Sequence, residues 1–371
     1  MIHDVVIIGG GLAGLALSLD LKKRGYTIVL IEKGSYPRQK VCGEYISMES
    51  HRYLLSLCPA LSGLNLPLIK NFRITSTGLR DFKTPLGSGG FGISRYLLEE
   101  LLYEEAKKAG VIFLLDTKAQ SIAASEAGIC SVVTKSETIR SKIICNASGR
   151  RSNLEMTERG QKQTGTNYVG IKYHIKLKRD AGLIEIHNFP GGYCGISAIE
   201  EDKSCLCYIV NAKELNAVNK SIPELEKKIL SQNVNLKKIF TDADFLFREP
   251  VTVSGINFLI KEPLTTEQFF LGDSAGSIAP VTGNGMSMGL RSAFVLANLL
   301  DDYFSGNITK DKLDKSYSDF WKKEFAMRIK LSRHFQKLSE YSSLTNITIR
   351  LFQVIPSLAR RIIRLTHGKP F

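Results

Sequence analysis

The pattern of apolar and polar positions predicts a strand, a glycine turn and a helix at the start of the 371-residue chain. Residues 5–8 are a continuous apolar, β-branched run, which is typical of a strand buried on both faces. Glycines follow, and apolar residues then recur at helical spacing until Gly25. A second apolar run occupies residues 27–31. The pattern therefore predicts a βαβ unit with parallel strands.

The rest of the chain changes between helical and strand periods. Helices are expected at residues 48–57, 96–109 (with Ser94 as N-cap), 289–301 and on both sides of Pro356. Strands are expected at residues 72–76, 82–85 and 269–273, and a small meander at 111–115, 120–124, 129–133 and 139–145. Glycines within residues 87–90 suggest a flexible connection. Between residues 168 and about 254, the alternation predicts a mostly antiparallel sheet.

The glycines of the first turn have the spacing that a dinucleotide needs. In Gly9-x-Gly11-x-x-Gly14, the first glycine permits a tight turn, the second lets the backbone approach a pyrophosphate, and the third lets the helix pack on the strand. The helix N-terminus then presents free N–H groups to the phosphates. Glu32 ends the second strand, where it can accept hydrogen bonds from ribose hydroxyls and disfavours the 2′-phosphate of NADP. FAD and NAD both remain open at this point.

A second strand, glycine turn and helix follow far down the chain. Asp273 ends the strand, and a turn with Pro280 and Gly283 precedes the helix. The repetition indicates the other half of one long cofactor, because a second nucleotide is a less economical explanation. Asp273 would bind a ribityl hydroxyl, and the amides of Gly285 and Met286 would face the polar edge of an isoalloxazine. NAD has no group for this second half, so the sequence predicts FAD.

Composition and charge narrow the class of protein. The chain is 43% hydrophobic with a net charge of +14, and from Ser305 onward 14 Lys and Arg face 5 Asp and Glu. This basic segment is helical in pattern, so a membrane surface or an acidic partner fits better than nucleic acid. Seven cysteines without a CxxC pair do not resemble a disulfide framework or a zinc site, and no metal is expected. We expect no signal peptide and a cytoplasmic protein, with peripheral contact at the inner face of the membrane.

Three motifs make the chain resemble the FAD-dependent family that contains p-hydroxybenzoate-hydroxylase-like monooxygenases, flavin halogenases and geranylgeranyl reductases. They are the glycine fingerprint with Glu32, the Cys42-Gly43-Glu44 loop, and Gly272-Asp273 with the turn that follows. The cysteine loop is most similar to the geranylgeranyl reductase branch, in which the cysteine lies beside the flavin. The resemblance covers about residues 1–300 and implies that Arg95 and the backbone of Ala119 also touch FAD.

Pattern and resemblance together predict an α/β fold. It comprises a Rossmann-like FAD-binding domain of the GR2 type, an inserted antiparallel β-sheet domain for the substrate, and C-terminal helices. The FAD-binding domain is expected at residues 1–70, 95–150 and 256–305, the substrate domain at 71–94 and 151–255, and the helical segment at 306–371. The predicted cofactor-binding residues are Gly9, Gly11, Leu12, Ala13, Gly14, Glu32, Lys33, Cys42, Gly43, Arg95, Ala119, Gly272, Asp273, Pro280, Gly283, Gly285 and Met286.

The chain departs from its relatives at three places. Many hydroxylases carry Asp-Gly, tied to FAD and NAD(P)H use, where this chain has Ser148-Gly149. The electron donor therefore stays open between NAD(P)H and a separate reductase or ferredoxin. The tryptophan motif of halogenases has no counterpart, since Trp321 is the single tryptophan. Gly-Gly-Tyr193 matches prenyl reductases, but the tryptophan and Phe-Pro that follow there are missing, which leaves open a different substrate.

Two side chains are candidates for catalysis. Cys42 is the group expected nearest the flavin, and its thiol could donate a proton after hydride addition. Tyr193 could orient or protonate a substrate. A packing role is the ordinary alternative for both residues. His174 and His187 are expected to be structural, because a lone histidine on a strand seldom acts in catalysis.

The sequence predicts an FAD-dependent oxidoreductase that reduces isolated double bonds in an apolar, lipid-like or prenyl-type substrate. The alternative is a monooxygenase that hydroxylates an aromatic or polyene substrate. A third hypothesis is a flavin-binding protein without its own chemistry that serves as a partner in a lipid pathway. The substrate sheet argues against the third, since such a protein has little need for a formed substrate site.

Overall fold

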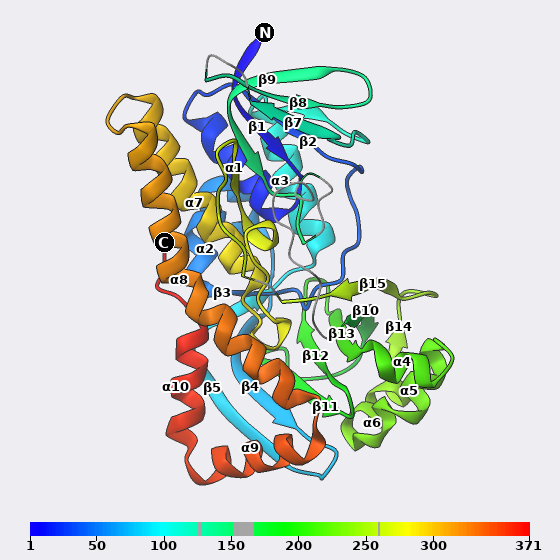
Figure 1. The fold of residues 1–371 in the computed structure, drawn as a ribbon. Helices are drawn as coiled ribbons and strands as arrows, with labels where there is room; N and C mark the ends of the chain where they lie inside the picture. The colour runs from blue at the N-terminus through cyan, green and yellow to red at the C-terminus, as the bar shows by residue number, and fades with distance from the viewer. Residues whose placement is uncertain (125–127, 151–153, 155–166, 259) are drawn as a thin grey trace.

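The computed structural model describes the chain except for residues 125–127, 151–153, 155–166 and 259. Two sheets lie one above the other, and the C-terminal helices extend along both (Figure 1). The polar stretch at residues 150–167, where the main domain boundary was expected, falls mostly outside the described residues. The division into domains stays a prediction, although the first sheet contains the N-terminus and the second sheet the expected substrate strands.

The first sheet has a parallel core, as the βαβ pattern predicts. Its strands run in the order β6 (Ile112–Leu114), β2 (Ile28–Ile31), β1 (Ile2–Ile8), β9 (Thr138–Asn146), β8 (Cys130–Val133) and β7 (Ser121–Ala124), and β16 (Gln268–Phe270) also pairs with β9. The pairs β6–β2, β2–β1, β1–β9 and β9–β16 are parallel. Strand β1 is buried on both sides from Val5 to Ile8, which explains its continuous apolar sequence.

Helices cover the first sheet and form the main core with it. Helix α1 (Leu12–Lys23) packs against α3 (Arg95–Lys108) and α7 (Gly285–Phe304), and α2 (His51–Leu57) also contacts α1. Ser94 caps α3 as expected, since its hydroxyl accepts a hydrogen bond from the Leu97 amide at 3.1 Å. The helices that follow the two glycine turns, α1 and α7, therefore lie side by side.

The second sheet is antiparallel apart from one parallel pair. Its strands run in the order β14 (Asp244–Phe245), β10 (Tyr168–Lys176), β13 (Ser204–Asn211), β12 (Gly192–Ala198), β11 (Leu183–Phe189), β4 (Leu68–Thr75), β5 (Asp81–Gly92) and β3 (Tyr45–Ser47), and β15 (Val251–Ile256) pairs with β10. Strands β4 and β11 are parallel. The sheet therefore joins strands from before and after the first domain's meander, as an inserted domain requires.

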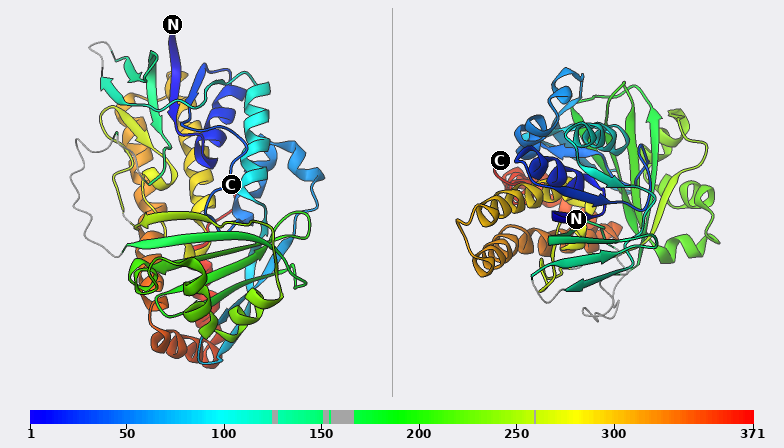
Figure 2. Two further views of the ribbon diagram at one scale, coloured as in Figure 1. Left: turned by 90° about the vertical axis from the view of Figure 1, so that its right-hand side faces the viewer. Right: turned by 90° about the horizontal axis from the view of Figure 1, so that it is seen from above.

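Both faces of the second sheet are covered (Figure 2). The outer face packs on α5 (Ile222–Lys228) and α6 (Val234–Asp242) through Leu225 and Leu236. On the inner side, α8 (Lys310–Ser339) contacts β12, and α9 (Ser342–Val354) and α10 (Pro356–Thr366) contact β5. Pro356 separates α9 from α10, as the sequence indicated.

Two local predictions are wrong. Residues 87–90 do not form a flexible connection but belong to β5, where Gly87 and Gly89 adopt φ values of +73° and +68°. Left-handed backbone of this kind favours glycine and accompanies the register shift between Ile69 and Asn71 in the β4–β5 pair. Strand β6 does not join the meander, but pairs with β2 at the opposite edge, because a strand that follows a crossover helix returns parallel.

Candidate active site

The glycine turn has the close contacts that its sequence requires. Gly9 follows β1 with φ +102°, and Gly11 is the N-cap of α1. A Cβ on Gly14 would collide with the carbonyl oxygen of Gly9, so only glycine lets the helix lie so close to the strand end. Gly14 therefore acts in packing and does not line the cavity.

Glu32 is an ionised carboxylate at the end of β2. It accepts hydrogen bonds from the Gly10 amide at 2.7 Å and the Gly34 amide at 3.1 Å, and Arg38 Nη1 lies 2.6 Å from it. Burial alone would raise the pKa of Glu32, but the hydrogen bond and charge of Arg38 outweigh it and lower the pKa. The carboxylate thus stays charged beside the glycine turn, where ribose hydroxyls were expected.

Three cations converge on the glycine turn around one buried carboxylate. Glu99 is inaccessible and is bonded by Lys40 at 3.0 Å and by Arg95, with Arg38 Nε at 3.6 Å. A Cβ on Gly11 would lie 3.5 Å from Lys40 Nζ and 3.8 Å from Arg95 Nη2. Even with Glu32 and Glu99 both ionised, the three cations leave an excess of positive charge.

Three buried atoms of this group make no hydrogen bond among the described residues: Arg38 Nε and Glu99 Oε2, which form an ion pair at 3.6 Å, and Arg95 Nε. Arg95 Nε is buried and makes no hydrogen bond there, although guanidinium N–H groups are nearly always bonded when buried. Burial lowers the pKa of Lys40 to about 8 in spite of Glu99. Excess charge and an open donor beside a helix N-terminus fit a bound pyrophosphate. Arg38, Lys40 and Glu99 were not predicted from the sequence, although the basic loop before Cys42 was a signal.

The second glycine turn lies against the first. A Cβ on Gly272 would contact the side chain of Ala13 at 3.5 Å and the backbone of Gly289 at 3.8 Å. Asp273 follows in a short 3-10 helix and lies 3.5 Å from Arg150 Nε. The two halves of the motif are therefore adjacent, as one extended cofactor would require.

A single cavity of about 830 Å³ joins both turns to the second sheet. Its volume is within the usual range for ligand sites, about 300–1,000 Å³. The lining includes Tyr193 and every predicted cofactor-binding residue except Gly14 and Ala119. Ala119 is buried in an apolar cluster with Val6 and Ile8, and its predicted contact with FAD stays a prediction.

The inner face of the second sheet forms an apolar part of this cavity. Residues from β4, β11, β12, β13 and β15 line it, among them Phe72, Ile186, Gly195, Ile209 and Val253. Phe352 of α9 and Ile362 and Ile363 of α10 line it too. The cavity thus continues from the glycine turns to the C-terminal helices, with an apolar surface at its far end.

Cys42 lies where the glycine-turn side of the cavity meets the second sheet. Its sulfur accepts a hydrogen bond from the Glu44 amide at 3.5 Å and interacts with the side chain of Arg95. Ser197 Oγ donates to the Gly43 carbonyl at 2.8 Å, and Cys205 Sγ lies 3.1 Å from the Cys42 carbonyl oxygen. The second sheet therefore holds the loop by its backbone, and Cys42 is one of the residues that line the cavity.

A buried ion cluster beneath this loop was missed by the sequence analysis. Glu44 is fully buried with φ +55°, and its carboxylate bonds Lys172 Nζ at 2.5 Å and His174 Nε2 at 2.6 Å. It also accepts a hydrogen bond from the Arg95 amide at 2.9 Å. Burial would raise the pKa of Glu44, but the hydrogen bond from His174 and the charge of Lys172 lower it. The cluster ties the cysteine loop to β10 and to the start of α3.

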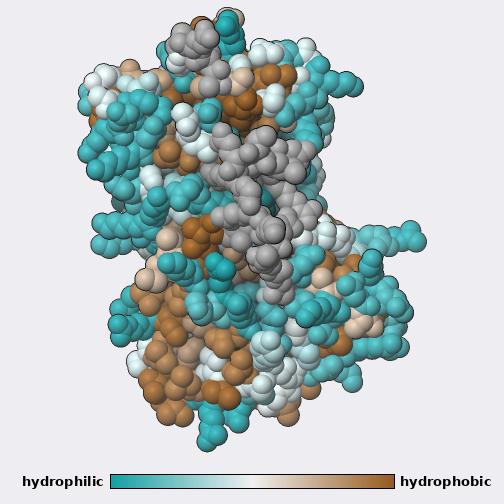
Figure 3. All heavy atoms as spheres, in the orientation of Figure 1, coloured by the Kyte–Doolittle hydropathy of each residue, from teal (hydrophilic) through white to brown (hydrophobic). Residues whose placement is uncertain are grey.

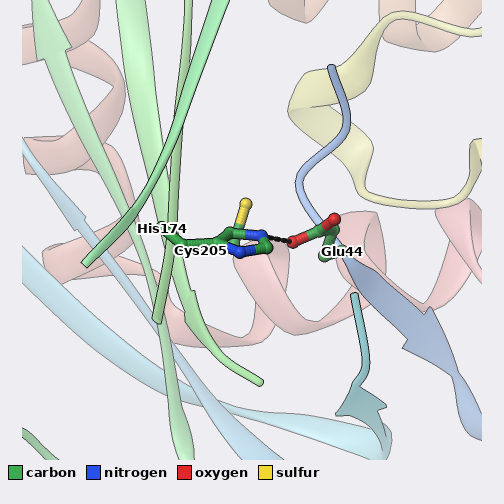
Figure 4. Close-up of side chains that lie close together, drawn as sticks. All are labelled: Glu44, His174 and Cys205. Atoms are coloured by element: carbon green, nitrogen blue, oxygen red, sulfur yellow. Dashed lines mark hydrogen bonds and ion pairs between the residues drawn. The ribbon is translucent and has the colours of Figure 1, made fainter. Parts of the chain in front are cut away.

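Ligand atoms of Glu44, His174 and Cys205 lie within 4.8 Å of one another (Figure 4). This spacing would suit a metal ion, yet the Lys172 ammonium already bonds the same carboxylate. We therefore describe the group as an ion cluster with a structural role. Lys172 and His174 are two residues apart on β10, so their side chains lie on the same face of the strand. This spacing is the one signal of the cluster in the sequence.

The outer surface of the C-terminal helices is apolar and basic. Figure 3 shows apolar side chains gathered over the lower part of the molecule, where α9 and α10 lie. The exposed apolar residues there are Leu344, Ile347, Leu351, Val354, Ile355 and Leu365. Arg350, Arg360, Arg361 and Arg364 are exposed beside them. Of the helices in the described part of the chain, none has the length and apolar character needed to cross a bilayer.

Fold and site together define an FAD-dependent oxidoreductase. The chain belongs to the FAD binding domain family, whose model matches residues 3–320. A digeranylgeranylglycerophospholipid reductase of Methanocaldococcus jannaschii is 23% identical over 91% of this chain and 88% of its own. The ubiquinone hydroxylase UbiL of Rhodospirillum rubrum is 24% identical over 81% and 72%. The flavin-dependent brominase Bmp2 has the same fold, with a TM-score of 0.81, 19% identity and coverage of 99% and 93%. The resemblance stated from the motifs, the fold class and FAD as the cofactor are confirmed.

Proposed function

We propose that the protein reduces carbon–carbon double bonds in a lipid-like or prenyl-type substrate. The observation that carries this proposal is the continuous cavity, which begins at the glycine turns and ends on an apolar wall of sheet and C-terminal helices. Such a wall suits a long apolar chain, because burial of apolar surface contributes about 25 cal/mol per Å². Similarity to a digeranylgeranylglycerophospholipid reductase supports the same substrate class.

The residues of the chain have distinct parts in this proposal. FAD, when bound, supplies the hydride. Glu32 would bind the ribose, Lys40 and Arg95 the pyrophosphate, and Asp273 the ribityl chain. The apolar wall would hold the substrate and exclude water. The Cys42 thiol would give its proton to the carbon next to the one that receives the hydride, and Arg95 lies beside its sulfur.

Hydroxylation is the second candidate. The similarity to UbiL over 81% of the chain favours it, and the cavity would also accept a quinone with an apolar tail. In that case one oxygen atom of dioxygen would enter the product. Cys42 would then not act as a proton donor, because hydroxylation does not require protonation of a carbon atom. The electron donor, NAD(P)H or a separate reductase or ferredoxin, is common to both candidates.

Product analysis separates the two activities. The FAD-loaded protein is reduced with dithionite and incubated with extracted membrane lipid, once without oxygen and once in air. The proposed reductase gives a product that has gained two hydrogen atoms in the anaerobic sample. A product that appears only in air and has gained one oxygen atom would refute the reductase and support the hydroxylase. No product in either sample would support a flavin-binding partner protein.

We further propose a cytoplasmic protein that touches the inner face of the membrane through α9 and α10. Exposed apolar side chains beside four arginines suit a surface of anionic lipid. The same two helices line the cavity from within, so an apolar substrate would have a short path from the bilayer. Flotation with anionic and neutral liposomes tests the contact, and unchanged binding after removal of residues 344–371 would refute it.

A further inference from the structure

The second sheet carries a polar pair within the mostly apolar part of the cavity. Asn188 of β11 and Tyr193 of β12 are directly opposite in the antiparallel register, so their side chains lie on the same face of the sheet. Both line the cavity, and only 2% and 3% of their surfaces are exposed. Ile186 and Ile209 flank the pair as their neighbours in the sheet.

Both side chains of this pair have a polar atom without a partner. Asn188 Oδ1 and the Tyr193 hydroxyl are buried and make no hydrogen bond within the part of the chain that the structure describes. Asn188 Nδ2 donates to the Ser339 carbonyl at 3.3 Å, which leaves Oδ1 as the open acceptor. Burial raises the pKa of Tyr193 well above its usual value, so its hydroxyl keeps its proton.

The neighbouring hydroxyl groups are already bonded. Ser339 Oγ donates to the Gln336 carbonyl at 2.7 Å. Thr345 Oγ1 donates to the Leu338 carbonyl of α8 at 3.3 Å, and Thr348 Oγ1 donates to the Leu344 carbonyl at 2.9 Å. Among the cavity-lining residues that the structure describes, buried polar atoms without hydrogen bonds otherwise occur in Arg38 and Arg95. Those two lie at the glycine turn, where the cofactor pyrophosphate is expected. The open atoms of Asn188 and Tyr193 therefore mark a second binding position in the same cavity.

We infer that Asn188 and Tyr193 bind a hydroxyl group carried by the apolar substrate. This inference rests on the proposed function in taking the cavity as the substrate site. Asn188 Oδ1 can only accept, so the ligand must bring a donor, and the Tyr193 hydroxyl can donate to the oxygen atom of the ligand's hydroxyl group. A hydroxyl satisfies both atoms, whereas an ether or a hydrocarbon leaves Asn188 Oδ1 unpaired. Tyr193 is thus assigned to binding and orienting the substrate, one of the two roles predicted for it.

Equilibrium dialysis of the FAD-loaded, oxidised protein tests this assignment. Farnesyl methyl ether keeps the oxygen of farnesol but has a methyl group in place of the hydroxyl hydrogen, so it lacks the donor; monoolein offers the hydroxyls of a glycerol lipid. We expect the protein to bind farnesol or monoolein about 3- to 10-fold more tightly than the ether, the effect of one net hydrogen bond. A preference for monoolein identifies a glycerol headgroup as the source of the hydroxyl, and a preference for farnesol identifies a free alcohol. Equal binding of all three probes overturns the inference.

Two variants give the matched comparison. Tyr193→Phe removes a hydroxyl that has no partner among the described residues and that can donate to an alcohol or an ether oxygen alike, so it should weaken the binding of both farnesol and the ether about 3- to 10-fold without lowering the melting temperature. Tyr168→Phe removes a hydroxyl that bonds Glu340, so it should lower the melting temperature and keep the preference. Asn188→Leu removes the acceptor that distinguishes an alcohol from an ether, so it should abolish the preference. A Tyr193→Phe protein that binds farnesol as tightly as the parent, or melts as low as Tyr168→Phe, contradicts the inference. The binding assay does not depend on turnover. A protein that prefers farnesol here but forms no reduced lipid in the anaerobic product analysis would refute the reductase and leave this inference intact.

Discussion

Lys172 Nζ lies 2.5 Å from Glu44 Oε1, and neither side chain is accessible to solvent. This buried ion pair connects strand β10 of the second sheet to the loop that carries Cys42. His174 and the Arg95 amide complete the bonding of the carboxylate. The position of the loop at the cavity therefore depends on a charge cluster whose members come from three separate parts of the chain.

Loss of the Lys172 ammonium should destabilise the fold strongly. Lys172→Met leaves the Glu44 carboxylate buried with fewer partners, and we expect the free energy of unfolding to fall by about 3–5 kcal/mol. Lys142→Met is the control, because Lys142 pairs with Asp4 while 54% of its side chain is exposed, and should cost less than about 1 kcal/mol. Urea denaturation measures both. Equal losses of unfolding free energy for the two substitutions would show that the buried pair contributes no more to stability than the exposed pair.

The same pair predicts how stability depends on pH. The pKa of Glu44 lies below its usual 4.5 because of His174 and Lys172, although burial opposes the shift. Its contribution is therefore present above pH 4.5 and is lost as the pH falls through the lowered pKa. The pKa of Lys172 lies above its usual 10.5 because Glu44 outweighs burial, so its contribution is complete below that pH and is lost in stronger alkali.

A substitution isolates the acid limb of this profile. Glu44→Gln should lower stability at neutral pH and reduce the further loss between pH 4.5 and strongly acidic conditions. Urea midpoints across a pH series measure the effect. If Glu44→Gln shows the same acid slope as the parent protein, Glu44 does not titrate as the cluster requires.

FAD affinity should decrease as the pH rises above about 8. Burial lowers the pKa of Lys40 to about 8 in the FAD-free protein, and a pyrophosphate binds the protonated form. Binding above this pH must therefore take up a proton, and affinity should fall by up to about tenfold per pH unit. Fluorescence titration with FAD at pH 7 and pH 9 measures this dependence. Lys40→Met should bind FAD more weakly at pH 7 and lose the dependence; a variant with the parent's pH profile would contradict the assignment.

Two glycine substitutions should separate folding from cofactor binding. Gly11→Ala meets no atom closer than 3.5 Å, but its methyl group would occupy the space between the helix and Lys40. We expect unchanged thermal stability and about tenfold weaker FAD binding, a loss of about 1.4 kcal/mol. Gly14→Ala would collide with the Gly9 carbonyl and should cost about 1–3 kcal/mol of stability as well. Equal melting temperatures for the two variants would contradict the packing role of Gly14.

Sequence reasoning succeeded where the signal is local. The turn from Gly9 to Gly14 and the cap at Ser94 depend on neighbours within a few residues, so spacing and residue type suffice to predict them. The antiparallel strands between residues 168 and 211 likewise follow from their alternation. Strand β6 was wrongly assigned to the meander, because a short apolar run carries no signal for the strand with which it pairs. It pairs with β2 because the chain crosses over through α3.

The parts of the site that escaped prediction depend on distant pairing. Glu44 and His174 are 130 residues apart, and their contact exists only because β10 lies beside the cysteine loop. A single buried histidine or lysine has no pattern that identifies its partner. Asn188 and Tyr193 are close in sequence, but their open hydrogen-bonding atoms become visible only when the surrounding hydroxyls are seen to be bonded.

Transfer of electrons from flavin to carbon, with Cys42 as the proton donor, is the central claim. Protein loaded with FAD and reduced without oxygen is mixed with geranylgeraniol or extracted membrane lipid, and flavin absorbance is followed with product mass. The parent protein should reoxidise its flavin anaerobically while the lipid gains two hydrogen atoms. The Cys42→Ala protein should bind FAD normally, and its FAD should be reduced as in the parent. Reoxidation of its flavin by the lipid should be about 100-fold or more slower, the usual effect of losing a proton donor. Flavin that stays reduced until air is admitted, followed by a product with one added oxygen atom, would contradict the account.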